Sequence, residues 1–112
     1  MIEVLDYSEE NKSFIKTLNV EWLEKYFAVE PNDEKQLSNP KEEIIDKGGM
    51  IFYARYKGKI VGCAALMKVD EQTYELSKMA VTESYQGLGI GKKLIEHCLD
   101  TTQKQHFTKL IL

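Results

Sequence analysis

The strongest constraint on the fold is a glycine-rich segment, residues 86–93, which reads QGLGIGKK. It follows an apolar, strand-like run from Tyr74 to Val81. After it, apolar residues recur at the spacing of one face of an α-helix: Ile90, Leu94, Ile95, Cys98 and Leu99. Glycines let backbone N–H groups point at a phosphate, and a helix start adds partial positive charge. The segment therefore predicts a strand, a turn and a helix that together form an anion site.

Two familiar phosphate motifs fail on spacing. The P-loop pattern needs a glycine five positions before Gly91, where Gln86 stands. It also needs Ser or Thr after Lys92, and that position is Lys93. The dinucleotide fingerprint would place its third glycine at Lys92, and it expects an acidic residue about twenty positions further on, where residues 107–109 are Phe, Thr and Lys.

A third pattern fits these residues. Gln86-x-x-Gly89-x-Gly91, placed directly after a strand, resembles the pyrophosphate-binding motif of the GNAT superfamily of N-acetyltransferases, which reads Arg/Gln-x-x-Gly-x-Gly/Ala. Residues 75–81 look like the strand that precedes this loop in the family. The resemblance covers essentially the whole chain, about two-thirds of a usual family domain. A glycine turn that merely ends a strand is the less favoured alternative, because the flanking strand and helix match as well.

Composition and charge narrow the classes of function. The chain has 112 residues, of which 43% are hydrophobic and 29% charged, as expected for one soluble domain spanning residues 1–112. Its net charge is −3 and it has no block of lysine or arginine, which argues against a nucleic-acid partner. No apolar run reaches the length of a membrane span, and the N-terminus lacks the regions of a signal peptide. We therefore expect a cytoplasmic protein without a membrane partner.

The cysteines and histidines predict no metal site. Cys63 and Cys98 are far apart, each in an apolar setting, while His97 and His106 lie on the predicted helix and just after it. These positions do not match the ligand spacing of a metal centre. We expect both cysteines to be small core residues, with a reactive thiol as the less favoured alternative.

The N-terminal half alternates between extended and helical patterns. Ile2–Tyr7 predicts a strand, and residues 8–26 predict a helix that Ser8 caps, with a break near Asn19. Residues 28–37 are polar and predict a connecting loop. Residues 39–48 begin with Asn and Pro and end with Gly, which predicts a short helix.

The C-terminal half predicts a mixed sheet. Met50–Tyr56, Ile60–Val69 and Tyr74–Val81 are separated by short polar turns and should form an antiparallel meander. After the helix that ends near Lys104, Thr108–Leu112 should pair in parallel with the strand at 74–81, giving a βαβ unit. The fold class is therefore α/β, in the order β-α-α-β-β-β-α-β. The GNAT resemblance implies the same order and indicates that the usual C-terminal helix and two strands are lacking.

The resemblance implies an acetyl-CoA-dependent N-acetyltransferase that moves an acetyl group directly to a primary amine. A lysine-like amine is mostly protonated at neutral pH, so the reaction needs a base. Glu75 lies eleven residues before Gln86, the spacing of the glutamate in the histone-acetylating branch of the family. Strand alternation would put it on one face with Ser77, Met79 and Val81, towards the coenzyme. A solvated, inert carboxylate at a strand end is the alternative.

The resemblance also implies which residues bind acetyl-CoA. The backbone N–H of Met79 would polarise the thioester carbonyl, so that Met79 joins Glu75 in the predicted catalytic set, and Val81 would bond to the pantetheine arm. The amides of residues 86–91 would bind the pyrophosphate, and Lys92 either adds positive charge or is an ordinary solvated residue. The predicted coenzyme site comprises Met79, Val81, Gln86, Gly87, Leu88, Gly89, Ile90, Gly91 and Lys92.

The acceptor is less constrained. The aromatic residues at 22, 26 and 27 end the first helix, where they are core residues or border the acceptor site. Three carboxylates in the connecting loop, Glu30, Asp33 and Glu34, favour a cationic amine, either a small molecule or a peptide. A non-catalytic acyl-CoA-binding or assembly module derived from the same fold is the alternative function.

The early stop at Leu112 leads to two further expectations. The helix that usually follows in the family commonly brings the tyrosine that protonates the leaving thiolate, so the sequence assigns no residue to that role. A final strand with Leu110 and Leu112 would leave an apolar edge and face open. We therefore expect self-association as a twofold homodimer.

Overall fold

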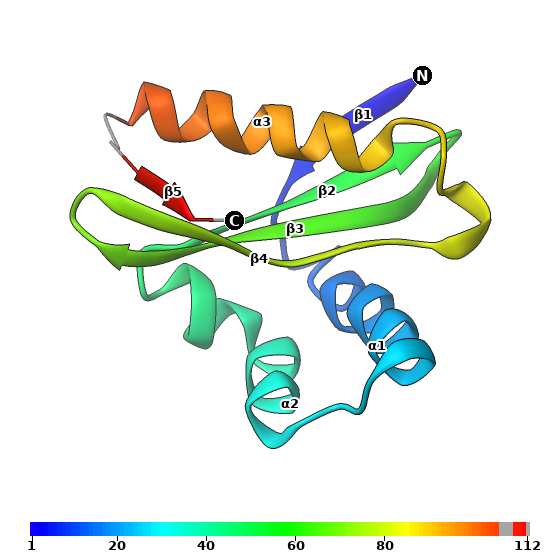
Figure 1. Cartoon of the computed structure of the whole chain (residues 1–112), viewed down its shortest axis with the longest axis horizontal. Helices are drawn as coiled ribbons and strands as arrows, with labels where there is room; N and C mark the ends of the chain where they lie inside the picture. The colour runs from blue at the N-terminus through cyan, green and yellow to red at the C-terminus, as the bar shows by residue number, and fades with distance from the viewer. Residues whose placement is uncertain (106–108, 112) are drawn as a thin grey trace.

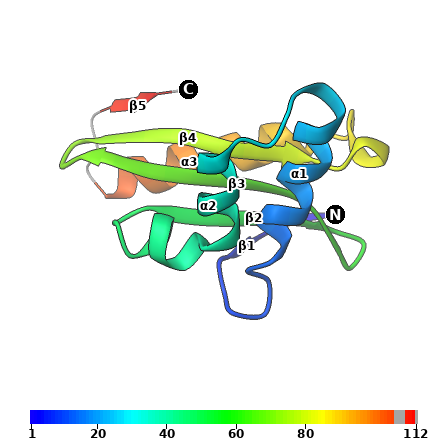
Figure 2. The ribbon, with the colours of Figure 1, turned by 90° about the horizontal axis from the view of Figure 1, so that it is seen from below.

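A five-stranded mixed sheet with helices on both faces forms the protein (Figure 1). The structure, a computed structural model, describes residues 1–105 and 109–111. The strands lie side by side in chain order: β1 Ile2–Asp6, β2 Met50–Tyr56, β3 Lys59–Asp70, β4 Thr73–Val81 and β5 Lys109–Ile111. The first four are antiparallel, and β5 pairs in parallel with β4 at the sheet edge, as Figure 2 shows. The predicted α/β fold, meander and βαβ unit are confirmed; positions 108 and 112 of the last predicted strand lie outside the described residues.

The helices divide between the two faces of the sheet, which creates two cores. The first face carries α1 Phe14–Tyr26, α2 Pro31–Ser38 and the π-helix η1 Lys41–Ile45, and the second carries α3 Ile90–Lys104, which follows the 3₁₀ turn η2 Glu83–Tyr85. The core under α1 contains Ile15, Leu18, Leu37, Ile44, Ile51, Tyr53, Cys63, Ala65 and Ala80. The core under α3 contains Phe52, Ala54, Val61, Ala64, Leu66, Tyr74, Ile90, Leu94 and Cys98.

The first helix begins later than the sequence predicts. Asn11, and not Ser8, organises the turn before α1, since its side chain donates to the carbonyl of Asp6 at 3.1 Å and accepts from the Ser8 N–H at 2.8 Å. The helix starts at Phe14 and continues without the expected break at Asn19. Asn19 is compatible with the helix because its side chain donates to the carbonyl of Ile15 one turn back, at 2.9 Å.

The prediction of a connecting loop over residues 28–37 is wrong, because α2 occupies most of this range. Pro31 stands at the first helical position, and Glu30 and Asp33 form a capping box in which each side chain accepts from the other's backbone N–H. Only Leu37 of this helix is buried, so the usual apolar periodicity is missing. A charge pair adds a tertiary link: Lys78 Nζ in β4 lies 2.6 Å from Asp33 Oδ1, and both side chains are mostly buried.

The predicted helix over residues 39–48 is present, wound as a π-helix at Lys41–Ile45. It ends at Gly48 and Gly49, and the Gly49 N–H donates to the carbonyl of Ile44 at 2.8 Å. None of the helices among the described residues combines the length and hydrophobicity that a membrane span requires.

Gly49 is the most confined glycine, and we expect a side chain there to destabilise the fold. A Cβ at Gly49 would lie 2.5 Å from the carbonyl oxygen of Leu66 and 2.8 Å from that of Ile44. Because both obstacles are backbone atoms, Gly49→Ala should lower the free energy of unfolding by about 3 kcal/mol. Gly58→Ala is the control: its Cβ meets no atom within 4 Å, and its φ of +82° should cost only about 1 kcal/mol. Urea unfolding measures both, and equal losses would contradict the clash.

The pair between Asp33 and Lys78 should make stability depend on pH. The hydrogen bond from the Lys78 ammonium is the largest cause that holds the pKa of Asp33 below its ordinary value. Since the folded pKa is lower than the unfolded one, this stabilisation is present above about pH 4 and is lost as the pH falls through the folded pKa. Asp33→Asn should therefore be less stable than the parent at neutral pH and lose less stability on acidification. Urea unfolding at several pH values tests this, and parallel profiles would refute it.

Candidate active site

A β-bulge in β4 interrupts its pairing with β3. Cys63 faces Ala80 and Ala65 faces Ser77, so two steps along β3 correspond to three along β4. Lys78 lies in the extra step with a φ of +52°, a left-handed conformation that costs a residue with a side chain about 1–2 kcal/mol. A bulge of this kind re-aims the residues that follow it.

The bulge turns Met79 and Val81 to the face opposite Glu75. Before the bulge, Glu75 lies across from Met67, which packs against the core under α1. After it, Val81 packs against the core under α3, and the Met79 side chain reaches the start of α3. The expectation that Glu75 and Ser77 share a face with Met79 and Val81 is therefore wrong. Strict alternation holds only in a strand without a bulge.

Side chains from α1, β3 and α2 hold the strained residue of the bulge. The Asn19 amide of α1 donates to the Lys78 carbonyl oxygen at 3.0 Å, and the Cys63 thiol of β3 lies 3.4 Å from the same oxygen. The Lys78 ammonium donates to Asp33 of α2. Both the carbonyl and the side chain of Lys78 are thus fixed from the α1 and α2 face, and these bonds offset the backbone strain.

The loop after β4 presents backbone N–H groups at the start of α3. Gly87 and Gly89 have φ values of +85° and +83°, and a Cβ at either position would meet no atom within 4 Å. Gly89 caps α3, and its carbonyl accepts from the Lys93 N–H at 3.0 Å. The N–H groups of the first helical turn have no acceptor within the helix. Open space, left-handed glycines and these donors together suit an anionic ligand.

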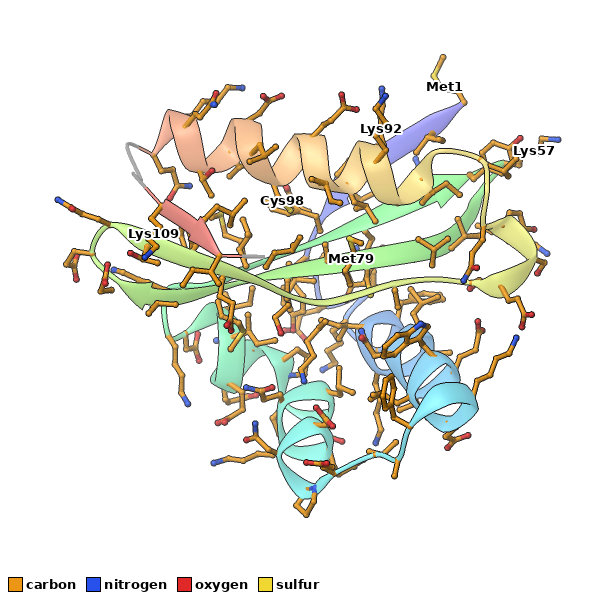
Figure 3. All side chains as sticks on the ribbon, in the orientation of Figure 1. Met1, Lys57, Met79, Lys92, Cys98 and Lys109 are labelled. Carbon is orange, nitrogen blue, oxygen red and sulfur yellow. The ribbon has the colours of Figure 1, made fainter. Side chains whose placement is uncertain are left out.

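A cavity of about 470 Å³ lies between this loop, β4 and α1. It is lined by Trp22, Met79, Ala80, Val81, Tyr85, Gln86, Gly87, Gly89, Ile90 and Gly91. The fold thus brings together the predicted coenzyme residues except Leu88 and Lys92. Leu88 is exposed, and Lys92 projects from the outer side of α3, whereas Cys98 lies on its inner side (Figure 3).

Gln86 joins the loop to the end of β4. Its side-chain amide donates to the Val81 carbonyl oxygen at 3.1 Å, while the Thr82 N–H donates to the Val61 carbonyl of β3 at 2.8 Å. Backbone groups of successive residues alternate in direction along an antiparallel pair, so the Val81 N–H points to the edge away from β3. With the Val81 carbonyl already bonded, its N–H is the group that remains for a ligand.

The outer edge of β4 is covered only where the strand begins. In the described part of the chain, β5 pairs with Thr73, Tyr74 and Glu75 alone. From Leu76 onwards β4 is hydrogen-bonded to β3 on one side and has no described strand on the other. Glu75 is exposed and does not line the cavity.

Aromatic residues close two sides of the cavity. Trp22 of α1 lines it and lies 5.2 Å from Phe27, ring centroid to ring centroid. Phe27 is 64% exposed, so it is not a core residue. Tyr85 lines the cavity at the loop and meets Tyr56 edge to face at 6.0 Å.

The three carboxylates expected to attract a cationic acceptor are used within the protein. Asp33 binds Lys78, and Glu30 completes the capping box of α2. Glu34 accepts from Lys16 at 2.9 Å and from Ser38 at 2.7 Å. They therefore provide weaker support for a cationic acceptor than the sequence indicates.

Both cysteines are core residues, as predicted. Burial raises the pKa of the Cys63 thiol to about 12 and that of Cys98 to about 11, so neither is a thiolate at neutral pH. Within residues 1–105 and 109–111, no three His, Cys, Asp or Glu side chains are close enough together to hold a metal ion.

Sequence reasoning missed Asn19 and Lys78. Asn19 follows Ile15 and Leu18 on the buried side of α1, and a polar residue at such a position signals a specific partner. Its partner could not be identified, because the carbonyl it binds is presented only by the bulge, and the bulge depends on how β3 and β4 pair.

Comparison with known proteins assigns this geometry to a family. Residues 12–112 match the Acetyltransferase (GNAT) family. The chain is 30% identical over 94 residues to an uncharacterized N-acetyltransferase of Bacillus subtilis, covering 78% of this chain and 61% of that protein. It is 35% identical over 60 residues to an uncharacterized N-acetyltransferase of Chlorobaculum tepidum, covering 54% of this chain and 39% of that protein.

Solved structures share the fold of this chain. A GNAT-family acetyltransferase of Staphylococcus aureus superposes with a TM-score of 0.84 at 24% identity, covering 96% of this chain and 69% of that one. A GNAT-family acetyltransferase of Elizabethkingia anophelis with acetyl-CoA bound superposes with a TM-score of 0.61 at 25% identity, covering 97% and 62%. The family match over residues 12–112, together with the glycine loop at the start of α3, leads to one conclusion: the chain belongs to the GNAT family of acetyltransferases.

Proposed function

We propose that this chain binds acetyl-CoA in the cavity beside β4 and transfers its acetyl group directly to a primary amine. The observation that carries the proposal is the cradle at Gly87 and Gly89, where left-handed glycines at the start of α3 line the cavity and a Cβ would meet no atom within 4 Å. A pyrophosphate bound by backbone amides and the helix dipole would fit this space.

The residues along β4 extend the site from the pyrophosphate towards the thioester. The Val81 N–H faces the open strand edge and would bind the pantetheine arm, since Gln86 already occupies the Val81 carbonyl. Met79 precedes it on the same face and would donate its N–H to the thioester oxygen, where negative charge develops during transfer. Lys92 lies outside the cavity lining, so it would act at most through long-range attraction.

The two substrates would approach β4 from opposite faces. Met79 and Val81 lie towards α3, whereas Glu75 lies on the side of α1 and α2. A base removes a proton from the acceptor and not from the coenzyme, so the amine would enter on the face of Glu75 and meet the thioester at the open edge of β4. An exposed carboxylate can receive that proton and pass it to water.

The non-catalytic binding module remains the second candidate because Glu75 is exposed and outside the cavity. Release of free CoA in the presence of a panel of small amines and peptides separates the two. Turnover supports the enzyme, and acetyl-CoA binding without turnover supports the module. The homodimer and the cytoplasmic location stay predictions.

Replacing Gly89 with Asp should abolish coenzyme binding. The new side chain would place a carboxylate in the cradle, and repulsion from the pyrophosphate should weaken binding at least about a hundredfold. Gly58→Asp is the matched control, since Gly58 has nearly the same φ of +82°, the same open surroundings, and a position in the β2–β3 turn. Titration calorimetry with acetyl-CoA measures both; unchanged affinity of Gly89→Asp would refute the site.

Replacing Glu75 with Gln should slow transfer without weakening coenzyme binding. Loss of a general base should lower kcat about a hundredfold near neutral pH. The loss should shrink as the pH rises, because the amine then deprotonates unaided. Glu71→Gln, in the β3–β4 turn, is the control and should keep the parent rate. If the pH–rate profile of Glu75→Gln matches the parent profile, Glu75 is not the base.

A further inference from the structure

We infer that Asn19 is a positioning residue, which aims the Met79 N–H into the cavity by holding the carbonyl oxygen of Lys78. The inference rests on the proposed function, because it concerns how the strand meets the thioester of acetyl-CoA. Asn19 lies on α1 and does not line the cavity, so it would act only through the backbone of β4.

The contacts of Asn19 account for both protons of its amide. The side chain is 4% exposed, and its nitrogen lies 2.9 Å from the Ile15 carbonyl oxygen and 3.0 Å from that of Lys78. The bond to Ile15 orients the amide within α1, and the bond to Lys78 crosses to β4. The Cys63 sulfur, 3.3 Å from the same nitrogen, lies beside the Lys78 oxygen as well. The oxygen is therefore held between α1 and β3.

The geometry of the peptide bond transmits this contact to Met79. The Lys78 C=O and the Met79 N–H belong to one planar peptide unit, which is trans here as at every described bond. In a trans unit these two groups point in opposite directions. Because the Asn19 amide fixes the oxygen, the N–H must point away from Asn19. Asn19 is not among the cavity residues, whereas Met79 lines the cavity close to Gly91.

The strain at Lys78 explains why its carbonyl oxygen must be held by another residue. A lysine at a φ of +52° would relax towards ordinary extended backbone if nothing held it. Relaxation would rotate the peptide between Lys78 and Met79 and redirect its N–H. Asp33 anchors the Lys78 ammonium but leaves the peptide free to turn. Of the two side chains that contact the Lys78 oxygen, the Cys63 thiol at 3.4 Å is the weaker donor, so Asn19 at 3.0 Å is the main determinant of the N–H direction.

Acetyl-CoA labelled with ¹³C at the thioester carbonyl tests this directly. A hydrogen bond to the carbonyl lowers its stretching frequency, which isotope-edited infrared difference spectra of the bound coenzyme report without any acceptor. We expect the band of the parent protein to lie at lower frequency than that of Asn19→Leu. The dissociation constant of CoA, which lacks the acetyl group, should stay within about threefold, since the cradle is unchanged.

Asn11→Leu is the matched control. Asn11 is also buried and also bonded to backbone, with contacts to Asp6 and Ser8, but it does not touch β4. Its variant should lose a comparable amount of stability and keep the parent band. If Asn19→Leu keeps the parent band, or if Asn11→Leu loses it equally, the inference is overturned.

Asn19→Asp keeps the test decisive if the leucine variant does not fold. A protonated carboxyl can donate to the Lys78 oxygen, whereas an ionised one cannot. The parent-like band should therefore appear at low pH and disappear as the pH rises, while the parent band stays constant. A pH-independent band in this variant would overturn the inference. If the band of the bound parent protein equals that of a thioester without a hydrogen bond, the inference is overturned but coenzyme binding still holds. If the parent protein does not bind acetyl-CoA, the proposed function itself is refuted.

Discussion

One extra residue in β4, opposite β3, determines the geometry of the whole cavity. Without it, the strand would alternate regularly and Glu75 would share a face with Met79 and Val81. With it, the strand divides into a first part whose odd positions face α1 and α2 and a second part whose odd positions face α3. The same strand therefore supplies groups to both faces of the sheet, which a regular strand could not do with this spacing.

The left-handed backbone at three positions of the candidate site serves two different purposes. At Gly87 and Gly89 it is nearly free of strain, and it leaves space and N–H donors at the start of α3. At Lys78 it is strained, and it persists because α1, α2 and β3 each contribute a polar contact. The cradle is thus built by local sequence, whereas the bulge is built by tertiary structure.

This difference explains what could be predicted from the sequence. The glycine loop, α3 and the meander follow from patterns within a few residues, and the structure has them where the sequence predicts them. The helix α2 was missed because it buries only Leu37, although Glu30, Pro31 and Asp33 carried a capping signal that polarity obscured. The prediction of the face on which Glu75 lies was wrong for another reason. The register between two strands is a non-local property, and residues 75–81 carry no local signal of a bulge.

The groups that β4 is proposed to offer to the coenzyme belong to its main chain, and this affects how such a site changes over evolutionary time. Exchange of the side chain at Met79 or Val81 leaves the N–H in place, provided that the bulge survives. Substitutions at these positions can therefore accumulate while the backbone donors are preserved, and residue identity is a poor guide to what the strand does. Selection would act instead on the distant residues that shape the backbone. Conservation in α1 and α2 would therefore reflect the function of this strand.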